Sequence, residues 1–156
     1  MSVMDLDTTT LAEARAWLED RLDDGAPCPC CEQNVKVYRR KITSPMARGL
    51  LRQYREVGRR PAHSASLVKA ETHEFSQLAW WNLITEEPGR REDGGRAGWW
   101  SITPAGEQFA LGHTRLPKYA HIYDGRVLDL DEGGETVDIH DALGARFHYG
   151  DLMAGV

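Results

Sequence analysis

The stretch WWSITPAGEQF, residues 99–109, contains the strongest structural signals in this sequence. Its first part, Trp99–Ile102, is apolar and aromatic, which is typical of a β-strand. Thr103 and Pro104 follow, and a hydroxyl cap before a proline at the first helical position indicates the start of a helix. We expect this helix to end at Gly112, so the stretch predicts a strand that leads directly into a helix.

The residues before this stretch carry further helix and strand signals. In chain order we expect a helix over residues 44–57, a short helical segment near 67–68, a helix over 73–83, a strand over 84–87 and a polar loop over 88–98. Ser44 and Pro45 supply the hydroxyl cap and the first residue of the 44–57 helix, and Gly58 ends it. Asn82 stands near the end of the 73–83 helix, where a left-handed residue is often needed.

The first forty residues predict a helix, a turn and a strand. Thr10 and Glu13 can form a capping box, which indicates a helix over residues 10–24. The apolar stripe of this helix consists of Leu11, Ala14, Leu18 and Leu22, with Trp17 alongside. The run CPCCEQ, residues 28–33, predicts a tight turn, and the alternating residues 35–41 predict a short strand.

The C-terminal part predicts mainly strands. Tyr119–Tyr123 and Arg126–Leu130 flank the pair Asp124-Gly125, which is a strong hairpin signal. A further strand over 136–139 and a short helical piece within 143–153 complete the chain. We therefore predict a single α+β domain over residues 1–156. In it an N-terminal helix and a C-terminal β-meander (residues 117–156) surround the elements of residues 44–112.

Length and composition exclude several classes of protein. The chain has 156 residues, of which 41% are apolar and 28% charged, as in an ordinary soluble globular domain. No apolar run approaches the roughly 20 residues of a membrane span, and the acidic start lacks the pattern of a secretory signal. Three cysteines cannot all pair with one another, so we expect a reducing, cytoplasmic location and no membrane contact.

The charge is distributed unevenly along the chain. The net charge is −5, yet residues 35–60 contain nine of the 19 Lys and Arg residues and a single acidic residue. Such a block is typical of a surface that meets a polyanion or an acidic protein partner. The alternative is that the block neutralises the acidic N-terminal helix within the fold, and charge counting alone leaves both open.

The order of expected elements over residues 44–112 resembles the winged helix-turn-helix family. The resemblance rests on Phe75, Leu78, Trp81 and Leu83-Ile84, and on the string aromatic–x–Ile–Thr–x–x–Gly–x–x–Phe within residues 99–109. The string is similar to the strand after the wing and the following helix in many bacterial transcription regulators. With the CPxC turn ahead and a strand-rich tail behind, the chain also resembles uncharacterised bacterial and phage winged-helix proteins. The resemblance covers nearly half of the chain.

The resemblance implies binding of double-stranded DNA in transcription control. The residues expected to face the major groove are His73, Ser76, Gln77 and Trp80, and Gln77 can read an adenine through two hydrogen bonds. The wing contacts implied are Arg90, Arg91 and Arg96. A basic stripe at helical spacing, formed by Arg48, Arg52, Arg55 and Arg59, can supply phosphate contacts if its face adjoins the groove. A homodimer would join two half-sites.

One departure from the family pattern supports another reading. Residues 72–84 contain no Lys or Arg but do contain Glu74, although phosphate neutralisation dominates affinity for DNA. The alternative is a winged-helix adaptor that binds a protein through the same helix, the wing or an exposed tryptophan. A third reading is a nucleic-acid-processing accessory protein with a structural zinc.

The cysteine turn contains half of a zinc motif. Cys28 and Cys31 have the C-x-x-C spacing of a zinc knuckle, and thiolates are preferred zinc ligands. A closed site needs four ligands, which His121, His63 or a second chain could complete. In the alternative reading the two cysteines pack as small apolar groups beneath Trp17.

Nothing in the sequence points to catalysis. The P-loop, G-x-S-x-G, H-E-x-x-H and G-x-G-x-x-G motifs are all absent. His121, His140 and His148, with Asp138 and Asp141, fall at ordinary strand and helix-start positions. We therefore expect no enzyme.

Overall fold

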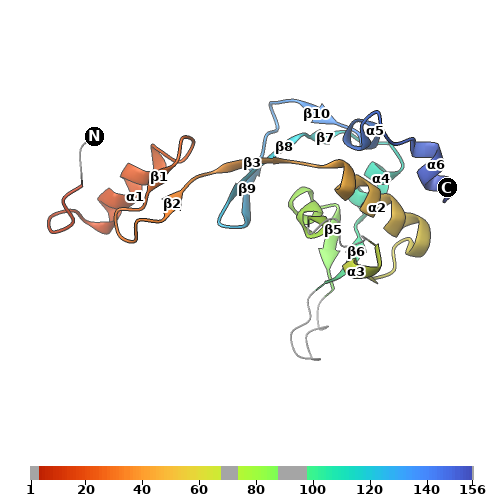
Figure 1. Ribbon diagram of the computed structural model, residues 1–156, viewed down its shortest axis with the longest axis horizontal. Helices are drawn as coiled ribbons and strands as arrows, with labels where there is room; N and C mark the ends of the chain where they lie inside the picture. Colours follow the sequence, from red (N-terminus) through yellow and green to blue (C-terminus); the bar gives the residue numbers. More distant parts are fainter. Residues whose placement is uncertain (1–3, 68–73, 88–97, 156) are drawn as a thin grey trace. The chain divides into compact units, whose positions relative to one another are not determined.

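The computed structural model of the chain describes residues 4–67, 74–87 and 98–155, and Figure 1 shows their helices and strands. The contacts divide the chain into two compact units. One comprises Met1–Arg40 and His121–Asp129, and we call it the N-terminal unit. The other, the main unit, comprises Lys41–Ala120 and Leu130–Val156. Helices combine with antiparallel sheets, so the expected α+β class is confirmed.

The main unit contains the central elements expected from the sequence. In chain order these are α2 (Ser44–Val57), β4 (Ala62–His63), α3 (Ser64–Leu67), η1 (Phe75–Trp81), β5 (Ile84–Glu86), β6 (Trp99–Ile102) and α4 (Pro104–Ala110). The three strands form an antiparallel sheet in the order β4-β6-β5. Ala62 pairs with Trp100 and Ile84 with Ile102, so β6 lies in the middle. Strand β4 was not expected from the sequence.

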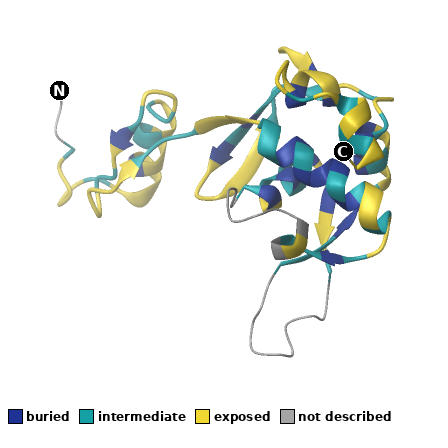
Figure 2. Ribbon diagram, turned by 45° about the vertical axis from the view of Figure 1, so that its right-hand side comes forward, coloured by how far each residue is buried: buried dark blue, intermediate teal, exposed yellow. Residues whose placement is uncertain are grey.

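The core of the main unit lies between α2 and the elements that surround it. Helix α2 contacts η1, α4, and two C-terminal helices, α5 (Ile139–Leu143) and α6 (Tyr149–Ala154). In Figure 2 the buried residues gather where these elements meet. The largest fully buried side chains are Phe75, Phe109, Met46, Leu50, Leu51, Leu78, Leu83, Ile84, Ile139, Leu143 and Gln53.

Two expectations about helix starts were wrong. Helix α2 is capped by Thr43 rather than Ser44, because the extended backbone of Thr43 lets its hydroxyl accept from the Met46 N–H. The 73–83 helix is a 3₁₀ helix that begins only at Phe75. Its buried residues Phe75, Leu78 and Trp81 recur every third residue, which matches three residues per turn and places them on one face. Asn82 ends η1 in the left-handed conformation, as expected.

The C-terminal part of the chain does not form a β-meander. Strand β10 (Thr136–Val137) pairs with β7 (Leu116–Pro117), far away in sequence, instead of extending the preceding hairpin. The expected strand over 136–139 ends early because Asp138 caps α5 in a capping box with Asp141. The single helical piece expected over 143–153 is therefore two helices, α5 and α6.

The N-terminal unit is built from short elements. These are α1 (Leu11–Glu19), β1 (Ala26–Pro27) and β2 (Asn34–Val35). Most of a second sheet also belongs to this unit, and its strands lie in the order β3 (Tyr38–Lys41), β8 (Tyr119–Tyr123) and β9 (Arg126–Leu130). The hairpin between β8 and β9 is confirmed, with Asp124 at φ 51° and Gly125 at φ 72°. The expected strand over 35–41 is interrupted because the Val37 N–H donates to the Leu22 carbonyl instead of a strand partner.

Helix α1 has the predicted cap but not the predicted stripe. The Thr10–Glu13 capping box is present. The helix ends at Glu19, earlier than expected, and Asp20 is its C-cap. Ala14 is the one buried residue of α1, whereas Leu11 is 74% exposed. The stripe therefore does not form the buried face that helical spacing suggested.

Candidate nucleic-acid interface and cysteine turn

The 3₁₀ helix η1 leaves one row of candidate residues at the surface. Ser76 is exposed, and Gln77 and Trp80 are half-buried. Three residues per turn bring Gln77 and Trp80 into one row, next to the row that enters the core. The Trp80 ring lies 6.3 Å from that of Trp81, whose Nε1 donates to the Pro117 carbonyl at 2.9 Å. His73, the fourth residue implied for the groove, lies outside the described residues.

The arginine stripe over residues 48–59, in α2 and just beyond its end, has partners within the protein. The Arg48 guanidinium lies 4.2 Å from the centre of the Phe147 ring. Arg55 donates to the Leu152 carbonyl at 2.8 Å and also pairs with Glu56 at 3.4 Å. The Arg48–Phe147 contact and the hydrogen bond from Arg55 to Leu152 join α2 to the C-terminal segment. The buried Nε of Arg48 has no hydrogen-bond partner in the described part of the chain.

The two remaining arginines of the stripe form surface ion pairs. Arg52 pairs with Glu56 at 3.0 Å, one helical turn away. Arg59 pairs with Glu107 of α4 at 2.5 Å, and this hydrogen bond raises the pKa of Arg59. The side chain of Arg59 is 72% exposed. Because exposed ion pairs are weak, Arg52 can leave Glu56 for another anion at little cost, whereas release of Arg59 would leave Glu107, whose side chain is only 18% exposed, without this partner.

The three arginines implied for the wing lie between strands that the structure does pair. Glu86 pairs with Trp100, and the Glu87 N–H donates to the Trp99 carbonyl at 2.9 Å. The chain between these strands contains Arg90, Arg91 and Arg96, which lie outside the described residues.

The cysteine turn connects the hairpin strands β1 and β2. The Cys28 N–H donates to the Gln33 carbonyl at 2.8 Å, and the Glu32 N–H donates back to the Cys28 carbonyl at 2.9 Å. Glu32 has a φ of 65°, in the left-handed region. The Cys30 N–H lies 3.4 Å from the Cys28 Sγ. Hydrogen bonds from the backbone N–H groups of Cys31 and Cys30 lower the pKa of the Cys28 thiol.

The thiols are accessible, and the histidines considered as zinc ligands have other contacts. Cys28 is half-buried and Cys31 exposed, which does not fit cysteines packed as apolar groups beneath Trp17. His121 pairs with Asp129, and the His63 ring lies edge-on to Trp99 at 5.6 Å. Over residues 4–67, 74–87 and 98–155, no group of three or more His, Cys, Asp or Glu side chains could hold a metal ion.

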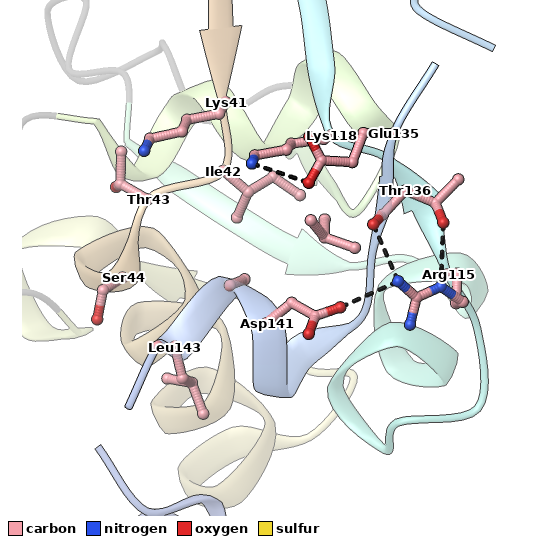
Figure 3. Close-up of a pocket in the computed structure, with 13 residues that line it drawn as sticks. Lys41, Ile42, Thr43, Ser44, Arg115, Lys118, Glu135, Thr136, Asp141 and Leu143 are labelled. Carbon is pink, nitrogen blue, oxygen red and sulfur yellow. Dashed lines mark hydrogen bonds and ion pairs between the residues drawn. The ribbon is translucent and has the colours of Figure 1, made fainter. Parts of the chain in front are cut away.

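A pocket of about 810 Å³ in the main unit was not foreseen from the sequence. Figure 3 shows its lining, which comes from residues 41–44 at the start of α2, from Arg115 and Lys118 on either side of β7, from residues 135–137 at β10, and from the end of α5. Arg115 donates to Asp141 at 3.1 Å and to the Thr136 carbonyl at 2.9 Å, so it fastens β10 to α5. Lys118 pairs with Glu135 at 3.2 Å. Arg115 and Lys118 therefore bind other residues of the pocket wall.

Comparisons and hydropathy add little to these observations. No described helix is long and apolar enough to cross a membrane. The chain matches no protein-family model, and comparison with curated proteins and with solved structures gives no significant match.

Proposed function

We propose that residues 44–112 form a winged helix-turn-helix and that this module binds double-stranded DNA. The observation that carries the proposal is the topology of the main unit. The chain runs α2, β4, α3, η1, β5, β6 and α4, with β6 in the middle of the antiparallel sheet. In helix-turn-helix proteins the second helix of the motif enters the major groove. Here η1 takes that place, and its core-facing row leaves Gln77 and Trp80 at the surface.

Different residues read the bases and bind the phosphates. Gln77 reads a base edge, since its amide can make two hydrogen bonds to adenine. Ser76 and Trp80 lie on the same helix, η1, as Gln77. Because η1 contains no Lys or Arg, affinity must come from the arginines in the β5–β6 connection and from Arg52 and Arg59, whose side chains are 39% and 72% exposed.

A salt-dependent titration tests DNA binding. Fluorescence anisotropy of a labelled duplex of random sequence should show binding at low salt, with a dissociation constant on the order of 1–100 μM. Replacing Arg90, Arg91 and Arg96 together by Gln should reduce the slope of log K against log salt by about 3, because each phosphate contact contributes about 0.9.

A charge-matched control makes the test specific. Arg15, Arg126 and Arg146 are exposed arginines outside residues 44–112. Replacing these three by Gln removes the same net charge and should leave the slope nearly unchanged. Absence of binding by the unmodified protein at about 100 μM in low salt would refute the proposal, because even non-specific binding appears in that range.

A protein-binding adaptor is the second candidate. It is favoured by the lack of cations on η1 and by the ion pairs of Arg52 and Arg59 with Glu56 and Glu107. In that case the duplex gives no anisotropy change at any salt concentration. The half-buried Trp80 then becomes the anchor of the interface, because tryptophan dominates many protein interfaces.

A further inference from the structure

The N-terminal unit has almost no hydrophobic core of its own. Within the described part of Met1–Arg40 and His121–Asp129, the buried apolar residues are Ala14, Ala26 and Ile122. Two alanines and one isoleucine bury little surface. Units much below about 60 residues are marginal even with a full core, and the smallest need a metal, disulfides or a partner chain.

The same unit exposes large apolar side chains. The exposed large hydrophobic residues of the described chain are Leu6, Leu11, Tyr38, Tyr123, Val127 and Leu128. All of them belong to the N-terminal unit, and Leu11 and Leu6 are 74% and 59% exposed. In the described part of the main unit, by contrast, the large apolar residues are buried or half-buried. Apolar surface concentrated in this way is typical of an interface with another molecule.

The cysteine turn of this unit has the geometry of a metal-binding knuckle. The backbone N–H of Cys30, two positions after Cys28, lies 3.4 Å from the Cys28 Sγ, and the Glu32 N–H donates to the Cys28 carbonyl at 2.9 Å, so the turn folds back over this sulfur. N–H groups aimed at a sulfur stabilise the thiolate, which is the form that binds a metal. The left-handed Glu32 closes the turn directly after Cys31.

Two cysteines make only half of a closed site. Structural zinc takes four ligands in a tetrahedron, and the described residues of this chain offer no group of three. A second copy of the same hairpin supplies an identical pair of thiolates. A two-fold axis through the metal then satisfies four-coordination, and two-fold dimers are the commonest protein assemblies.

We propose that Cys28 and Cys31 bind one Zn²⁺ together with Cys28 and Cys31 of a second copy of this chain, forming a zinc-bridged homodimer. Each thiol releases its proton to solvent as the sulfur binds the metal. The second copy also offers apolar surface of the same kind, which can cover part of the exposed apolar residues of the N-terminal unit. Binding energy of the metal thus replaces the core that each unit lacks. This inference does not depend on DNA binding by the main unit.

Zinc content and molecular mass, measured on the same tag-free protein, test the proposal. Protein expressed with zinc and kept reduced should contain about 0.5 equivalent of zinc per chain by elemental analysis and run as a dimer by light scattering. Cys28→Ser and Cys31→Ser should lose the zinc and become monomers. Cys30→Ser is the matched control, because Cys30 lies in the same turn but is not a proposed ligand, and it should retain both properties.

Cobalt substitution provides a readout that does not depend on the folding of a variant. Addition of Co²⁺ to the chelator-treated unmodified protein should give thiolate-to-metal charge transfer and intense tetrahedral d–d bands that saturate at about one metal per two chains. Absence of both metals from the unmodified protein overturns the proposal. One zinc per monomeric chain also overturns it, since the chain then completes its own site. A dimer that persists after removal of the metal overturns the proposal as well.

Discussion

Gly106 allows helix α4 to lie directly against the backbone of Leu83. A Cβ at this position would stand 2.0 Å from the Leu83 carbonyl oxygen and 2.8 Å from Cγ1 of Ile102. Since neither the carbonyl nor the buried isoleucine can move without shifting the sheet, glycine is required here by close approach. Gly106, the glycine of the string Ile–Thr–x–x–Gly, is therefore needed for the packing of α4 against Leu83.

Replacing Gly106 by Ala should therefore destabilise the main unit by about 2–3 kcal/mol, the cost of overpacking a core. Urea unfolding followed by tryptophan fluorescence measures the change. Gly133→Ala is the control, because a Cβ at Gly133 meets nothing within 4 Å. Equal stability of the two variants would show that the α4 contact is loose.

Gln53 is a buried polar residue that the sequence did not single out. It is 0% exposed, and its Nε2 donates to the Trp100 carbonyl of the central strand β6 at 2.8 Å. Gln53→Ala removes this hydrogen bond and opens a cavity, so we expect a loss of about 2–4 kcal/mol. Gln108→Ala, on the exposed side of α4, should cost less than about 0.5 kcal/mol. Similar unfolding midpoints for both variants would contradict this role.

At the scale of elements, α5 depends on its N-terminal capping box and on Arg115. The Asp141 carboxylate accepts from the Asp138 N–H at 3.1 Å and from Arg115 at 3.1 Å. The Asp138 N–H lowers the pKa of Asp141 below its usual 3.8, and Arg115 lowers it further, against an opposing effect of partial burial.

The lowered pKa of Asp141 predicts a pH-dependent stability. A carboxyl whose pKa is lower in the folded state stabilises the fold above its unfolded pKa, and this stability is lost as the pH falls through the folded pKa. Asp141→Asn should therefore reduce the thermal midpoint at neutral pH, and the difference from the unmodified protein should shrink below about pH 4. Glu132→Gln, an exposed residue with the same charge change, serves as control. A difference that is constant from pH 7 to pH 3 would contradict the prediction.

At the scale of the whole molecule, the two units differ in what holds them together. The main unit has a core built on Leu50, Phe75 and Phe109, all essentially inaccessible to solvent. The N-terminal unit has no comparable set of buried residues in its described part. Stability in the two units should therefore depend on different conditions.

Removal of the proposed zinc should affect the N-terminal unit selectively. Hydrogen exchange measured by mass spectrometry, with and without EDTA, should show lost protection over residues 11–19 and 26–35. Protection over 44–57 and 104–110 should remain, because these helices rest on the core of the main unit. Uniform loss over both units, or no change in either, would contradict a metal-dependent N-terminal unit.

Part of the fold and of the candidate site follows from local sequence. The capping box of Thr10, the cap of Thr103 and the left-handed Asn82 were all predicted, because each depends on hydrogen bonds or backbone angles within a few residues. Ser76, which the resemblance to the winged helix-turn-helix family implied to face outward, is exposed. The binding roles of these residues stay predictions.

The remaining features depend on residues far apart in the chain. Sequence spacing placed Arg55 in a basic stripe, but its partner, the Leu152 carbonyl, lies 97 residues away. Residues distant in sequence also meet where β10 pairs with β7 and where Gln53 is buried against β6. Local hydrogen bonds and backbone preferences determined where elements begin and end. Tertiary packing alone decided that β10 pairs with β7 and that Arg55 and Arg59 contact the Leu152 carbonyl and Glu107, because those free energies arise only when distant segments meet.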